Sequence, residues 1–141
     1  MTLAYMKNGK IDRTSIKVAE KSEFLTISYQ IKDGWDVIVH LISADDHAQV
    51  YLNGVLIYAL DINHSTPPIS IKNILSPGAN ELRVVGIDDN PGGENYWSID
   101  YTIGIFDAND KPAYDAIHIP LRGRSYSSGI KHDVIYTLIK V

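Results

Sequence analysis

The dipeptide Asn53-Gly54 constrains the fold of this chain more than any other feature, because it lies between two runs of apolar residues. In a two-residue hairpin loop both central residues adopt a positive φ, which Gly reaches freely and Asn tolerates better than most residues. Apolar and polar residues alternate over 48–52, before the turn, and an apolar run follows it over 55–60. The sequence therefore predicts an antiparallel β-hairpin with its turn at Asn53-Gly54.

Alternation with a period of two also covers 24–31 and 97–105, which is the pattern of half-buried strands. Further strands are predicted over 16–18, 37–42, 81–87, 114–121 and 134–141, with a short strand or one helical turn over 69–75. Turns or loops are predicted at 77–80, 88–95, 107–112 and 122–129, where Gly, Pro, Asn, Asp and Ser gather. We therefore expect a single all-β domain over 1–141, an antiparallel β-sandwich. The residues expected to share its core are Val50, Leu52, Ile57, Leu82, Val84, Ile99 and Tyr101.

A series of short motifs follows a recurring order along residues 42–89. Asp45-Asp46 precedes a strand, Val-Tyr-Leu-Asn-Gly occupies 50–54, Ile-x-Ile-x-x-Ile-Leu occupies 69–75, and Pro-Gly-x-Asn-x-Leu-x-Val occupies 77–84. This order resembles the galactose-binding-like jelly-roll superfamily, which includes carbohydrate-binding modules and the sugar-binding domains of β-galactosidases and β-glucuronidases. The resemblance implies a jelly roll. It also implies a binding role, since many members bind carbohydrate while others bind lipid, nucleic acid or protein or brace an enzyme.

Composition and charge narrow the classes of partner. The net charge of −4 argues against a nucleic-acid partner held mainly through phosphate contacts. No apolar run approaches the ~20 residues of a membrane span, and the first residues carry no signal-peptide pattern. The chain has no cysteine, which excludes disulfides and thiolate chemistry. A cytoplasmic location is therefore the default expectation, with secretion by a signal-less route as the alternative.

Two polar segments supply the candidate ligand-binding residues, because they flank strands that the resemblance implies are neighbours. They are Asp45, Asp46 and His47 before the hairpin, and Asp88, Asp89, Asn90, Glu94 and Tyr96 in the second segment. Carboxylates and amides can form hydrogen bonds with sugar hydroxyls, and an aromatic ring can stack on the C–H face of a sugar. Hard oxygen ligands in loops also suit Ca²⁺, with Asp88, Asp89 and Glu94 as the candidate set. The alternative is that Asp and Asn occupy these turns because their side chains bond local backbone groups.

Other aromatic and titratable residues are further candidates for a site. Trp97 is in register with Ile99 and Tyr101 and is predicted to be a core residue, which leaves Tyr96 on the opposite face as the ligand platform. The remaining aromatic–polar candidates are Trp35, Tyr58, His64 and Tyr126. The five histidines show no His-x-x-x-His pair, and the chain has no Gly-x-Ser-x-Gly elbow, so neither zinc binding nor serine hydrolysis is indicated.

The sequence thus favours a non-enzymatic, lectin-like carbohydrate-binding module. It also predicts a homo-oligomer, because the strands over 37–42 and 134–141 carry apolar residues on both faces, and large exposed apolar patches are unusual in monomers. Two alternatives stay open. The first is a structural or protein-interaction scaffold on the same fold, and the second is a small β-sandwich enzyme.

Overall fold

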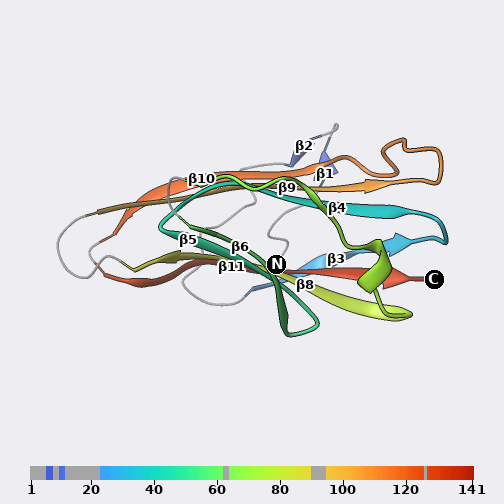
Figure 1. Ribbon diagram of the computed structural model, residues 1–141, viewed down its shortest axis with the longest axis horizontal. Helices are drawn as coiled ribbons and strands as arrows, with labels where there is room; N and C mark the ends of the chain where they lie inside the picture. Colours follow the sequence, from blue (N-terminus) through green and yellow to red (C-terminus); the bar gives the residue numbers. More distant parts are fainter. Residues whose placement is uncertain (1–5, 8–9, 12–22, 62–63, 90–94, 126) are drawn as a thin grey trace.

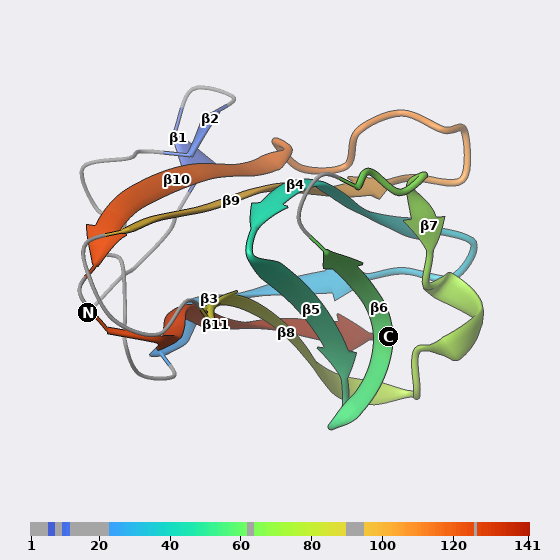
Figure 2. The ribbon, with the colours of Figure 1, turned by 60° about the vertical axis from the view of Figure 1, so that its left-hand side comes forward.

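A computed structural model describes residues 6–7, 10–11, 23–61, 64–89, 95–125 and 127–141. Figures 1 and 2 show two β-sheets packed face to face. One sheet has the strand order β10-β9-β4-β7, the other has the order β3-β11-β8-β5-β6, and β1 and β2 form a small separate pair. The strands are β1 (Met6–Lys7), β2 (Lys10–Ile11), β3 (Glu23–Ile31), β4 (Asp36–Asp45), β5 (His47–Leu52), β6 (Val55–Asp61), β7 (Ile69–Ser70), β8 (Gly78–Asp88), β9 (Asn95–Phe106), β10 (Ile117–Ser125) and β11 (Gly129–Lys140).

The predicted all-β sandwich is confirmed, while its jelly-roll connectivity stays a prediction. The segment over 69–75, expected to be a short strand or a helical turn, contains both: β7 and the 3₁₀ turn η2 (Lys72–Ile74). No helix in the described part of the chain is long and apolar enough to cross a membrane. The strand expected over 16–18 lies outside the described residues.

The hairpin of β5 and β6 has its turn where the sequence places it. Asn53 has a φ of 50° and Gly54 a φ of 83°, as a two-residue turn requires. The Asn53 side chain also ties the turn to β8, since its Oδ1 accepts a hydrogen bond from the backbone N–H of Glu81 at 2.9 Å. Its Nδ2 donates to Oδ1 of Asn80 at 2.9 Å. Asn53 therefore favours the turn and also attaches it to the neighbouring strand.

One pair of strands departs from the expected antiparallel pattern. β3 and β11 pair in parallel, with Leu138 opposite Tyr29. Parallel neighbours need a long connection between them, and here nearly the whole described chain separates the two strands. β11 is consequently an inner strand of the five-stranded sheet, between β3 and β8.

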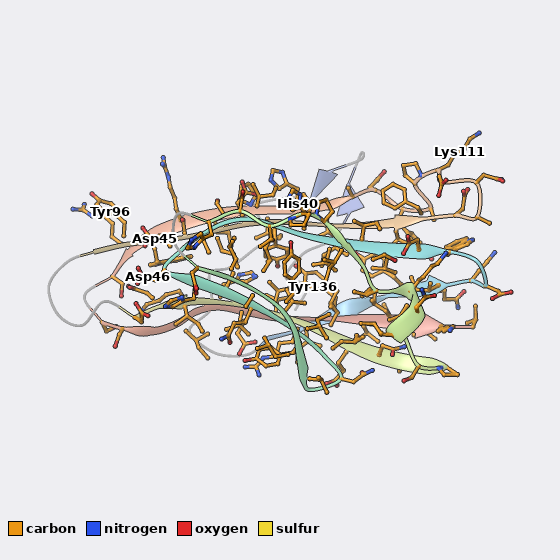
Figure 3. The ribbon with its side chains drawn as sticks, in the orientation of Figure 1. His40, Asp45, Asp46, Tyr96, Lys111 and Tyr136 are labelled. Carbon is orange, nitrogen blue, oxygen red and sulfur yellow. The ribbon has the colours of Figure 1, made fainter. Side chains whose placement is uncertain are left out.

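The core lies between the two sheets and contains the residues predicted for it. All but one of them are buried, and Ile57 is half-buried and packs against the others. Near the middle of this core the hydroxyl groups of Tyr101 and Tyr136 lie 2.6 Å apart, and Nε2 of His132 lies 2.8 Å from that of Tyr101. Figure 3 shows Tyr136 between the two sheets. This polar network gives the buried hydroxyl groups hydrogen-bond partners, which they cannot obtain from water.

The two strands predicted to be apolar on both faces behave differently. In β4 the odd positions over 37–41 are buried in the core, while the even positions Ile38, His40 and Ile42 are only half-buried, so the predicted homo-oligomer stays a prediction. In β11 both faces are buried. Val134 and Tyr136 belong to the core, while Asp133 and Ile135 on the other face are 1% and 7% exposed. The chain itself therefore covers the second face of β11.

Several predicted boundaries shift in the structure. β8 begins at Gly78 rather than after residue 80, because the buried Asn80 side chain bonds back to the backbone of Ser76 and steadies the turn from within the strand. The strand expected over 114–121 starts at Ile117, and Tyr114 instead packs its ring against Trp35.

The loop predicted over 122–129 is largely a strand, since β10 continues to Ser125 as an edge strand paired with β9. Its polar residues suit an edge, where one side of the strand has no neighbour. Gly123 is required there, because a Cβ at this position would lie 2.8 Å from the ring of Trp97.

Candidate ligand-binding site at one end of the sandwich

The two polar segments identified in the sequence meet at one end of the sandwich. Asp45 ends β4, His47 begins β5, and Asp88 ends β8. β5 pairs with β8 so that His47 lies opposite Ile87, which brings Asp89 beside the start of the hairpin. Figure 3 shows Asp45, Asp46 and Tyr96 at the same end of the molecule.

Hydrogen bonds fix the relative position of the two segments. The backbone N–H of Asp46 donates to the carbonyl of Ile87 at 3.0 Å, and the backbone N–H of Asp89 donates to Oδ2 of Asp46 at 3.0 Å. Desolvation alone would raise the pKa of Asp46. The hydrogen bonds that its carboxylate receives, first from the Asp89 backbone, outweigh this and lower the pKa. Asp46 is therefore an ionised carboxylate that holds the site together.

His47 bridges two carboxylates from different strands. Its Nδ1 lies 2.8 Å from Oδ1 of Asp61 at the end of β6, and its Nε2 bonds Oδ2 of Asp89. These hydrogen bonds, first that with Asp61 and then that with Asp89, raise the pKa of His47 above its usual value. The imidazolium form donates from both nitrogens, so it orients both carboxylates at once.

Asp61 was not among the predicted site residues, although the hairpin register places it there. Counting back from the turn would pair His47 with Leu60. A register shift between Val50 and Tyr51 moves the ladder by one residue, so His47 lies opposite Asp61. Such an irregularity depends on the packing of the whole sheet and leaves no signal in the sequence.

The remaining carboxylates divide into buried and exposed groups. Asp88 is fully buried, whereas Asp89 is exposed. Partial burial, followed by a hydrogen bond with Asp46, raises the pKa of Asp45. A ligand arriving from solvent therefore meets Asp89 and Asp61 first, with Asp45 and Asp88 behind them.

Tyr96 projects from β9 and is 63% exposed, as expected of a ligand platform. The guanidinium of Arg124, its partner on β10, lies over its ring at 5.3 Å from the centroid. Arg124 was not predicted as a site residue. Trp97 is buried, so its assignment to the core is confirmed.

The predicted calcium site includes Glu94, which lies outside the described residues, as does the candidate ligand residue Asn90. Among the described residues no group of three or more His, Asp or Glu side chains is arranged to hold a metal ion. Calcium binding by Asp88, Asp89 and Glu94 stays a prediction.

Of the remaining candidates, Tyr58 serves the fold, while His64 lies beside the site, since its backbone N–H donates to the carbonyl of Asp61 at 3.2 Å. The Tyr58 hydroxyl bonds Oγ1 of Thr66 and the carbonyl of Pro67, so it anchors the segment after β6. Trp35 lies in the turn between β3 and β4, His64 is exposed, and Tyr126 is outside the described residues.

Comparisons of the chain with protein families, with curated proteins and with solved structures find no match.

Proposed function

We propose that this chain is a non-catalytic carbohydrate-binding module of the galactose-binding-like type, and that its glycan binds at the end of the sandwich that carries His47 and Tyr96. The observation that carries the proposal is the pair of exposed carboxylates, Asp61 and Asp89, held on either side of the His47 ring. Ionised carboxylates are strong acceptors for sugar hydroxyls.

The bridging histidine gives this acceptor pair a fixed geometry before any ligand arrives. Each carboxylate uses one oxygen on His47 and keeps acceptor capacity on the other. Groups ordered in the free protein lose less entropy on binding, so preorganised acceptors favour affinity. Tyr96 supplies the second element of sugar recognition, an exposed ring at the same end.

The arrangement favours binding over hydrolysis. Glycoside hydrolysis uses two carboxyl groups that flank the bond, one of them protonated to serve as the acid. At this site His47 draws one oxygen of each exposed carboxylate to a single ring. Both carboxylates therefore bond the same imidazole ring through one oxygen each, which is the arrangement of a fixed acceptor pair.

A glycan array read with and without EDTA tests the proposal. We expect the parent protein to bind a defined set of glycans, and both Asp89→Asn and Tyr96→Ala to weaken that binding while a thermal melt still shows a folded protein, since both side chains are exposed. Asp110→Asn is the matched control, because Asp110 is an exposed Asp in the turn after β9 with a φ of 60°, which Asn tolerates. Loss of the glycan signal in EDTA would show that calcium is part of the binding site.

The proposal fails if the parent binds no glycan on a broad array, or if neither variant weakens binding while the fold is intact. The second candidate function, a structural or protein-interaction scaffold subunit, then takes precedence. It is favoured by Val55 and Leu56, which are 64% and 49% exposed on β6, an edge strand of the five-stranded sheet. The predicted homo-oligomer is tested separately: sedimentation at high micromolar concentration should show a dimer or larger species, and a monomer would contradict that prediction.

A further inference from the structure

A cavity lies at the opposite end of the sandwich from the acidic site (Figures 1 and 3). Its volume is about 200 Å³, and it lies between the end of β3, the turn that leads into β4, the 3₁₀ turn η2 and the end of β11. Figure 1 shows these elements together at the end of the molecule that carries the C-terminal residue. Nothing in the acidic site described above contributes to this cavity.

The cavity is cationic although the chain as a whole carries a net charge of −4. Lys32, Lys72 and Lys140 line it, and Asp33 is the single carboxylate among its described lining residues. None of the three lysines forms an ion pair with another described residue. Like charges repel when they converge, so three cations at one cavity are stabilised by an anion placed among them.

One of these lysines is also oriented. The Lys32 ammonium lies over the Trp35 ring, 5.6 Å from its centroid, which is a cation–π contact. The Trp35 ring is itself packed edge-on against Tyr114, with the two centroids 6.1 Å apart. This contact holds the ammonium at the cavity before a ligand arrives, which lowers the entropic cost of binding.

We propose that this cavity binds an oxyanion, a carboxylate or a phosphate, carried by a small molecule. Lysine ammonium groups hold such anions as point charges, and the Asn73 amide in the lining adds hydrogen-bond donors. A volume of about 200 Å³ is below the ~300–1,000 Å³ typical of pockets for drug-sized ligands. The part of the ligand that lies inside the cavity is therefore no larger than a monosaccharide.

Titration calorimetry with three probes tests this assignment: glucuronate, inorganic phosphate and uncharged glucose. We expect glucuronate or phosphate to bind, with an affinity that falls as salt is added, and glucose to show no binding at this cavity. Stronger binding of glucuronate than of phosphate would identify a saccharide acid as the source of the anion. Equal binding would identify the free anion.

Single substitutions Lys72→Gln and Lys140→Gln should each weaken anion binding about tenfold, because a charged hydrogen bond contributes roughly that much. Lys111→Gln is the matched control, since Lys111 is an exposed lysine at the same end of the molecule that does not line the cavity. The variants Lys72→Gln, Lys140→Gln and Lys111→Gln should all stay folded, which a thermal melt checks. An equal loss in Lys111→Gln, or no binding of either anion by the parent at millimolar concentration, would overturn the proposal. Asp89→Asn should leave anion binding unchanged, so failure here and failure of the glycan site are distinguishable.

Discussion

Replacing Arg83 with Met should lower the free energy of unfolding by about 3 kcal/mol, because it removes the bidentate partner of a buried carboxylate. The Arg83 guanidinium donates from Nε to Oδ1 of Asp133 at 2.7 Å and from a terminal nitrogen to Oδ2 at 2.6 Å. The Asp133 side chain is 2% exposed and that of Arg83 is 36% exposed. The loss of stability therefore comes mainly from Asp133, because water does not reach its buried carboxylate to solvate it.

The estimate takes the low end of the ~3–5 kcal/mol seen when one partner of a buried ion pair is removed, because half of this pair touches solvent. For a chain of this size that loss corresponds to a melting temperature lower by about 10 °C. Differential scanning calorimetry at neutral pH measures both quantities.

A double-mutant cycle separates the pair from its surroundings. Asp133→Asn removes the buried charge, so Arg83→Met should cost clearly less in that background than in the parent. Arg83→Lys should fall between, since an ammonium keeps the charge but cannot form two parallel bonds. A melting temperature for Arg83→Met within about 2 °C of the parent would refute the reasoning, because the buried carboxylate would then not depend on the guanidinium.

Three further outcomes follow from the described contacts. Ile99→Ala should destabilise the fold by about 2–4 kcal/mol in urea titrations, since Ile99 is fully buried and its removal leaves a cavity; an unchanged midpoint would contradict the core assignment. Gly123→Ala should shift the Trp97 fluorescence and lower the melting temperature, because the new Cβ would lie 2.8 Å from the indole; an unshifted spectrum would show that β10 can move aside. The two carboxylates raise the folded-state pKa of His47 above its unfolded value near 6.5, so its contribution to stability is complete below that pH and is lost as pH rises through the folded pKa. His47→Gln should flatten this part of a stability–pH profile, and an identical slope in parent and variant would argue against the bridge.

The parts of the fold that the sequence predicts are those governed by local rules. The Asn53-Gly54 turn follows from backbone stereochemistry, and the alternation in β9 follows from burial on one face. The strand character of Arg122–Ser125 was missed because Gly and Ser there suit a loop equally well. What makes Gly123 a strand residue is the Trp97 ring lying over it, which is a tertiary contact.

The sequence predicts the candidate site only in part, because tertiary structure decides which of its residues come together. The resemblance to sugar-binding domains points to Asp45–His47 and Asp88–Tyr96, and the β5–β8 pairing brings the first segment beside Asp88 and Asp89. Asp61 lies in the site only because of the register shift in the hairpin, and no local sequence pattern predicts that shift. The cationic cavity draws Lys32, Lys72 and Lys140 from three distant parts of the chain, so only the folded structure reveals it.

The parallel pairing of β3 with β11 has a consequence for how the chain reaches its fold. β11 occupies an inner position of its sheet, so β3 and β8 stay unjoined until residues 129–140 are available. During synthesis the earlier strands must therefore wait with their pairing edges open, which exposes them to wrong partners. The contacts that close the sheet span nearly the full described length, and such non-local pairing slows folding. We expect a nascent chain arrested before residue 129 to be protease-sensitive, and resistance to appear in one step once β11 has left the ribosome.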